Sequence, residues 1–98
     1  MATHELKIWP EYFEAIIAGT KTFDLRKNDR DFQVGDILWL REWHPNGHYY
    51  SGRETMQRVT YILPHLPMAG CAATFGLQPG HVVMAICAPS RPRVADDT

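Results

Sequence analysis

Three side chains with complementary chemistry lie close together in the first third of the chain: the ammonium of Lys21, the carboxylate of Asp24 and the guanidinium of Arg26. Lys21 can anchor a phosphate as a point charge, and a partly buried lysine can also lose its proton and act as a base. Asp24 and Arg26 are two residues apart, so they share one face of a strand. There the carboxylate could accept from the amino group of a base while the guanidinium binds a carbonyl or phosphate. The alternative is a surface lysine after a turn, beside an exposed ion pair worth less than about 1 kcal/mol.

A shared site depends on how Lys21 and Asp24 are placed relative to each other. Strict alternation along residues 21–27 puts their side chains on opposite faces of a strand. They can meet only if Lys21 belongs to the preceding turn or if a bulge separates them. If they do meet, Lys21 and Asp24 are the candidate catalytic pair of an enzyme, with Asp24 as nucleophile or base.

Further cations extend the candidate nucleic-acid contacts. Residues 27–31 form a dense charged turn, in which Lys27 and Arg30 could contact phosphates; the alternative is a solvated turn whose charges pair with one another. The full set of expected contacts is Lys21, Asp24, Arg26, Lys27, Arg30 and Arg53.

Aromatic side chains lie near the later arginines. Exposed rings beside Arg41 and Arg53 could stack on unpaired bases, although aromatic residues more often pack than bind. Trp39 shares a strand face with Ile37 and is therefore expected in the core. The stacking candidates that remain are Trp43, Tyr49 and Tyr50.

The five histidines form no recognisable metal-binding set, and no metal or cofactor is expected. His44 and His48 have the spacing of helical ligands, but Pro45 and Gly47 lie between them and exclude that helix. His4, at the head of the first expected strand, could line a cleft; the alternative is a structural histidine with a satisfied hydrogen bond.

Composition restricts the chain to one globular domain. It has 98 residues, 45% of them hydrophobic and 21% charged, with a net charge of −1. Near-neutral charge argues against strong non-specific binding along a duplex but permits a local basic cleft. Cys71 and Cys87 have no metal-ligand spacing and are expected as reduced thiols in a cytoplasmic protein. Charged residues in the first ten positions argue against a signal peptide, and no apolar run approaches the roughly 20 residues of a membrane helix.

The expected elements are a strand at 4–8, a helix that starts at Pro10 and is stopped by Gly19, and strands at 21–27, 37–43, 53–63 and 81–88. The last strand is apolar on both faces and is expected in the interior of the sheet. A short helical turn is expected around 71–75. We expect an α+β fold, a small and mostly antiparallel barrel of five or so strands with one main helix, in a single domain of residues 1–88 followed by a flexible tail at 89–98.

The run HELKIWPEYFEAIIAGTKTFDLRKNDRDFQVGDIL resembles the DUF3850 family, a bacterial and phage group in the ASCH/PUA-like superfamily. The resemblance continues through LREW, residues 51–54, VTYIL and residues 79–83. The superfamily pattern GxKxxExR is matched by GTKTFDLR, with Asp24 in the place of Glu. The resemblance implies a PUA-like barrel with a cleft proposed to bind RNA. Some relatives look like amidohydrolases of acylated cytidine that use a lysine, a threonine and a distant glutamate, and others are reported to cut RNA. Here Asp24 stands at the threonine position. No acidic residue occurs between Glu54 and Asp96, so the distant glutamate has no obvious counterpart.

Three functions remain open. The first is a nucleic-acid-binding module for RNA or a single strand, bound in a cleft lined by the GxKxxDxR motif. The second is a small amidohydrolase that acts on a modified, acylated nucleoside through Lys21 and Asp24. The third is a protein-interaction adaptor of a phage or mobile element. The expected partner is accordingly RNA, a nucleotide or nucleoside, or a protein, and not a membrane.

Overall fold

The computed structural model describes residues 1–64 and 77–88. They form five strands and one helix, in the order β1 (Thr3–Ile8), α1 (Pro10–Ile17), β2 (Phe23–Lys27), β3 (Ile37–His44), β4 (Tyr49–Pro64) and β5 (His81–Cys87). The expected α+β class is confirmed, with the five strands and the main helix close to their expected positions. The helical turn expected around 71–75 and the tail at 89–98 lie outside the described residues.

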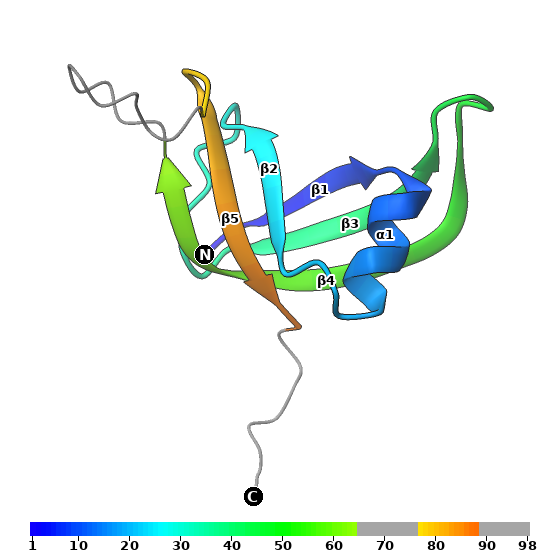
Figure 1. Cartoon of the computed structure of the whole chain (residues 1–98), viewed down its shortest axis with the longest axis horizontal. Helices are drawn as coiled ribbons and strands as arrows, with labels where there is room; N and C mark the ends of the chain where they lie inside the picture. Colours follow the sequence, from blue (N-terminus) through cyan, green and yellow to red (C-terminus); the bar gives the residue numbers. More distant parts are fainter. Residues whose placement is uncertain (65–76, 89–98) are drawn as a thin grey trace, which may run out of the picture.

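The strands form one mixed sheet in the order β1-β3-β4-β5-β2. β1 pairs with β3 in parallel, and the other three pairings are antiparallel. The sheet curls strongly, so that β5 and β2 stand across from β1 and β3 (Figure 1). It is an open half-barrel whose two edge strands, β1 and β2, face the same gap.

Helix α1 begins at Pro10, whose missing N–H is not needed in the first turn. The carbonyl of Trp9 accepts from the amides of Tyr12 and Phe13 and so closes that turn. Gly19, with φ of +83°, ends the helix in the left-handed region that glycine adopts without strain. The amide of Lys21 then donates to Ala15 O at 3.1 Å, which ties the start of the next segment to the helix end.

The core lies on the concave face of the curled sheet. Phe13 and Ile16 of α1 pack there against the inward side chains of the strands. Burying apolar side chains of this size stabilises the fold by about 1.5–3 kcal/mol each. The buried apolar residues are Leu6, Ile8, Phe13, Ile16, Phe32, Leu38, Leu40, Val59, Val82, Met84 and Ile86.

The prediction that Trp39 lies in the core was wrong. The inward face of β3 carries Leu38, Leu40 and Glu42, so Ile37 and Trp39 lie on the opposite, partly exposed face. Because β3 has apolar residues on both faces, alternation alone does not say which face is inside. β5 is interior in the sheet order, as expected, between β4 and β2.

The start of β4 also differs from expectation. β4 begins at Tyr49 and not at Arg53, because a long hairpin pairs His44 with Tyr49 and Trp43 with Tyr50. A register shift between Arg41 and Trp43 lets this hairpin bend away from the body of the sheet.

Candidate functional site

Lys21, Asp24 and Arg26 come together in the structure. β2 starts at Phe23, so Lys21 belongs to the turn, and its Nζ lies 3.6 Å from Asp24 Oδ1 and donates to Phe23 O at 2.6 Å. Arg26 Nε donates to the other oxygen of Asp24. Asp24 is buried at 5% exposure, between these two cations. The condition set by the sequence, that Lys21 lie in the turn, is therefore met.

Two arginines bridge the gap between the sheet edges. Arg26 Nη2 donates to Lys7 O at 2.9 Å, and Arg30 Nη1 donates to Glu5 O at 3.0 Å. Both acceptors are main-chain oxygens on the free edge of β1. Such an edge would otherwise expose unpaired polar groups. The main-chain oxygens on this edge of β1 thus accept hydrogen bonds from arginine side chains, where a neighbouring strand would supply main-chain amides.

A pocket of about 300 Å³ opens where β1, the start of α1 and β2 meet. Trp9 and Tyr12 form one wall, with their rings stacked at a centroid distance of 6.3 Å and an angle of 17°. Trp9 is 49% exposed and Tyr12 48% exposed, so both rings present surface to solvent. The Nζ of Lys21 lies 5.7 Å from the Tyr12 ring centroid, at the side of this wall. The lining residues are Lys7, Ile8, Trp9, Tyr12, Asp24, Leu25 and Arg26.

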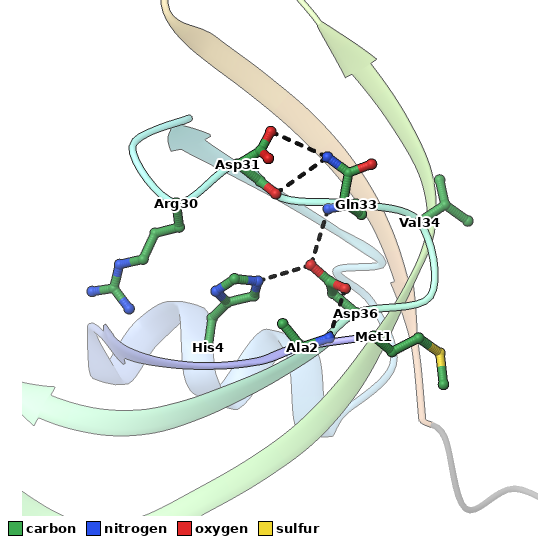
Figure 2. A pocket seen from close by; sticks show the side chains of 8 residues that line it. All are labelled: Met1, Ala2, His4, Arg30, Asp31, Gln33, Val34 and Asp36. Atoms are coloured by element: carbon green, nitrogen blue, oxygen red, sulfur yellow. Dashed lines mark hydrogen bonds and ion pairs between the residues drawn. The ribbon is translucent and has the colours of Figure 1, made fainter.

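A second pocket, of about 480 Å³, lies at the other end of β1 (Figure 2). His4 Nε2 is 2.8 Å from Asp36 Oδ2, and the same carboxylate accepts from the amides of Ala2 and Gln33, each at 3.0 Å. Burial alone would raise the pKa of Asp36, but the bonds from Ala2, His4 and Gln33 outweigh it and lower the pKa below 3.8. His4 therefore has the satisfied hydrogen bond of a structural histidine, and the pocket that it lines is not the one beside Asp24 and Arg26.

Arg53 lies apart from the Lys21–Asp24–Arg26 cluster. Its guanidinium binds both oxygens of Glu42, at 2.9 and 2.7 Å, also binds Glu14 of α1, and covers the Phe13 ring at 4.8 Å. Arg53 holds the pKa of the Glu42 carboxyl down at about 2, with help from the Ser51 hydroxyl and against the effect of burial. This arrangement fastens α1 to β3 and β4, and both carboxylates occupy the guanidinium.

Lys27 and the later aromatic residues also lie outside the first pocket. Lys27 is exposed at the end of β2, on the face opposite Asp24 and Arg26. Among the rings that were expected to stack on bases, Trp43 is covered by Lys7 Nζ at 4.1 Å, Tyr50 by Arg41 at 4.0 Å, and Tyr49 stacks on His44. Each of these contacts occupies one face of its ring, and none of the three rings lines the first pocket.

Sequence reasoning missed the aromatic wall of the first pocket. In the sequence, Trp9 beside Pro10 indicates a staple for the start of the helix, and Tyr12 has the helical spacing of an apolar face. A signal was available, because neighbouring side chains lie about 100° apart around a helix, so the helix that buries Phe13 turns Tyr12 toward the edge of its apolar face. Asp36 was missed for a different reason: a carboxylate next to a turn glycine gives no sign that it is buried.

The described residues contain no cluster of three or more His, Cys, Asp or Glu side chains arranged to hold a metal ion. Within the same part of the chain, no helix has the length and apolar character needed to cross a bilayer.

Residues 3–86 match the family described as Domain of unknown function (DUF3850), and the chain belongs to this family. It is also similar to a protein of Escherichia phage P2 that is described as an uncharacterized 12.9 kDa protein in the GpA 3′ region. The two are 37% identical over 59 residues, which cover 60% of this chain and 52% of the phage protein. The matched region thus spans about half of the phage relative.

Proposed function

We propose that this protein is a binding module for single-stranded nucleic acid, RNA in the first place, and that an unpaired base enters the pocket between β1, α1 and β2. The observation that carries the proposal is the Trp9–Tyr12 wall, two half-exposed stacked rings next to Lys21, Asp24 and Arg26. Exposed rings beside cations are the usual platform for bases of a single strand.

The polar side of the pocket supplies what a base and its phosphate need. The base would continue the Trp9–Tyr12 stack, because every base offers a flat face. Arg26 has N–H groups beyond those that bind Asp24 and Lys7 O, and these can donate to a base carbonyl or a phosphate. Lys21, beside the Tyr12 ring, supplies a point charge for a phosphate, and Lys7 lines the same pocket.

The charge balance favours a short ligand over a long duplex. The net charge is −1, so only a local group of cations attracts phosphates. Binding through two or three phosphates of a single strand gives a shallow salt dependence, with a slope of about −0.7 for each phosphate. The resemblance of GTKTFDLR to the ASCH/PUA-like pattern supports the same function, since RNA binding is proposed for that superfamily.

Hydrolysis of an acylated nucleoside is the second possibility, and the Lys21 geometry makes it less favourable. An amine acts as a base only through a free lone pair. Lys21 Nζ donates to Phe23 O and lies against the Asp24 carboxylate, which is the arrangement of a charged ammonium. We therefore assign Lys21 to ligand binding and rank catalysis second.

The test is a fluorescence-anisotropy titration of a labelled eight-residue oligouridylate at two salt concentrations, with paired variants. Tyr12→Ala should weaken binding about tenfold or more, since stacking on one ring is worth about 1–3 kcal/mol. Tyr61→Ala, at a ring 63% exposed on β4, is its matched control. Lys21→Gln should weaken binding and lower the salt slope by about 0.7, whereas Arg58→Gln, at an exposed cation of β4, should change neither.

Equal losses in Tyr12→Ala and Tyr61→Ala would contradict the proposed pocket. N4-acylated cytidines are added to the same protein, and the acid they release is measured. Product that disappears in Lys21→Gln would make the protein a hydrolase. If the protein neither binds the oligonucleotide nor forms product, and the tagged full chain retains a specific partner from phage-infected cells, the adaptor function takes first place.

A further inference from the structure

The two pockets lie at opposite ends of β1 and are joined by the free edge of that strand. Trp9 and Tyr12 wall the pocket at the end of the strand, and His4 lines the pocket at its start. Between them, Arg26 reaches Lys7 O and Arg30 reaches Glu5 O. The edge between the pockets therefore carries two guanidiniums in a row.

The second pocket has donors that no group in the described part of the chain uses. Arg30 donates to Glu5 O through Nη1, and its other N–H groups have no described acceptor. His4 binds Asp36 through Nε2, so Nδ1 is its remaining polar atom. Figure 2 shows the Arg30 guanidinium on the side of the His4 ring that faces away from Asp36.

The acids of this pocket are already satisfied. Asp36 accepts from Ala2, His4 and Gln33, and Asp31 accepts from the amide group of Gln33 at 3.1 Å. The groups left to meet a ligand are thus a guanidinium and an imidazole nitrogen. Both donate to an anion when the imidazole carries its second proton, and the guanidinium fork matches the oxygens of a phosphate.

We propose that His4 and Arg30 form a phosphate subsite, and that a single strand whose base occupies the Trp9–Tyr12 pocket runs along the β1 edge to reach it. This inference rests on the proposed function and adds a path and a length to it. The acceptors of Arg26 and Arg30 on β1 are two residues apart, about 7 Å along a strand. That is roughly the reach of one extended nucleotide. The path continues beyond these two arginines to the Trp9–Tyr12 pocket at one end and to His4 at the other, so the ligand is a segment of about three nucleotides.

The experiment is a calorimetric titration of the full chain with oligouridylates of one to four nucleotides, each carrying a terminal phosphate, and with inorganic phosphate alone. Affinity should rise from one to three nucleotides and then stay level. Arg30→Gln should weaken the trinucleotide about tenfold and leave the mononucleotide unchanged. Arg58→Gln is the matched control, because it removes the same charge from an exposed position of β4.

A measurement on the unaltered protein covers the case in which Arg30→Gln does not fold. The ¹⁵N resonance of His4 Nδ1 should move when the trinucleotide is added and stay in place with the mononucleotide. If the resonance stays in place with both, while the Trp9–Tyr12 pocket binds both, the subsite is wrong and the proposed function stands. If inorganic phosphate binds His4 as tightly as the trinucleotide does, a free-phosphate site replaces the strand path. If no oligonucleotide binds at Tyr12, the proposed function fails, and the strand path fails with it.

Discussion

Arg26 of β2 and Lys7 of β1 lie on the two edge strands of the sheet, and a hydrogen bond of 2.9 Å joins the guanidinium of one to the main-chain oxygen of the other. The same guanidinium binds the buried carboxylate of Asp24. One side chain therefore links the motif carboxylate to the opposite wall of the half-barrel. The candidate site and the closure of the fold depend on the same residue.

This double role predicts that Arg26 is not replaceable by lysine. Arg26→Lys keeps the charge, but a single ammonium cannot replace the planar fork that reaches both Asp24 and Lys7 O. We expect a loss of about 1–2 kcal/mol in the free energy of unfolding, measured as a lower urea midpoint at an unchanged slope. Arg58→Lys, at an exposed position of β4, should stay within about 0.5 kcal/mol. Equal midpoints for the two variants would show that the fork contributes nothing.

The lowered pKa of Glu42 predicts how the free energy of unfolding depends on pH. Its pKa in the folded protein is about 2 against an ordinary value of 4.5, so its contribution is complete above pH 4.5 and is lost as the pH falls toward 2. The full pKa shift corresponds to about 3 kcal/mol in the free energy of unfolding. We expect a contribution of about 2 kcal/mol, because the Arg53 side chain is half exposed and solvent screens the ion pair.

The measurement for Glu42 is a series of urea unfolding curves between pH 6 and pH 2. Glu42→Gln should remove the part of the slope that falls between pH 4.5 and 2. Glu11→Gln, at an exposed glutamate in the first turn of α1, should retain it. A variant and a parent with parallel pH profiles would refute the assignment to Glu42.

The three hydrogen bonds to Asp36 predict that this residue, although remote from the first pocket, contributes strongly to the free energy of unfolding. Asp36→Ala removes the acceptor of three donors at a position that is 2% exposed. We expect a loss of about 3 kcal/mol and faster hydrogen exchange at the Gln33 amide. The control is Asp29→Ala, at an exposed residue of the same loop, which should stay within about 0.5 kcal/mol. Unchanged exchange at Gln33 would mean that this amide does not depend on Asp36.

The position of Trp9 predicts that binding of a base changes the intrinsic tryptophan fluorescence. Trp9 is half exposed at the first pocket, whereas Trp39 lies on the other face of the sheet and Trp43 is covered by Lys7. A base stacked at the pocket should quench the intrinsic fluorescence, and Trp9→Phe should remove most of that quenching. Trp39→Phe should leave it intact. Quenching that survives in Trp9→Phe would mean that the base stacks elsewhere.

Much of the fold could be predicted from local patterns. Pro10 and Gly19 mark the ends of α1, and the apolar β5 is an interior strand, because these signals act within a few residues. It was harder to predict which face of each strand points into the core. β2 turns Phe23 and Leu25 toward solvent and buries Asp24, the reverse of what hydrophobicity favours. Lys21 and Arg26, both within three residues of Asp24, compensate the buried carboxylate, and Arg26 is held in turn by the β1 edge, which is distant in the chain.

Some features of the candidate site could likewise be predicted from the sequence, and others could not. The closeness of Lys21, Asp24 and Arg26 follows from their spacing once Lys21 is assigned to the turn. Arg53 could not be separated from them by sequence, because its partner Glu14 lies on a helix far from it in the chain. The outward turn of Tyr12 could be inferred from its neighbour Phe13, but the position of the aromatic wall depends on how α1 sits against β1 and β2, which no local pattern encodes.

The sheet order has a consequence for how the chain folds as it is made. Among the described strands, β2 pairs with β5 alone, from Phe23 with Ala85 to Lys27 with His81, so its partner is synthesised much later than β2 itself. Until β5 docks, β1 and α1 can assemble with β3 and β4, but the strand that carries Asp24 and Arg26 lacks its pairing partner. Pairings this distant in sequence slow folding. We therefore expect the site to be completed late in folding, and a chain stalled before residue 81 to lack it.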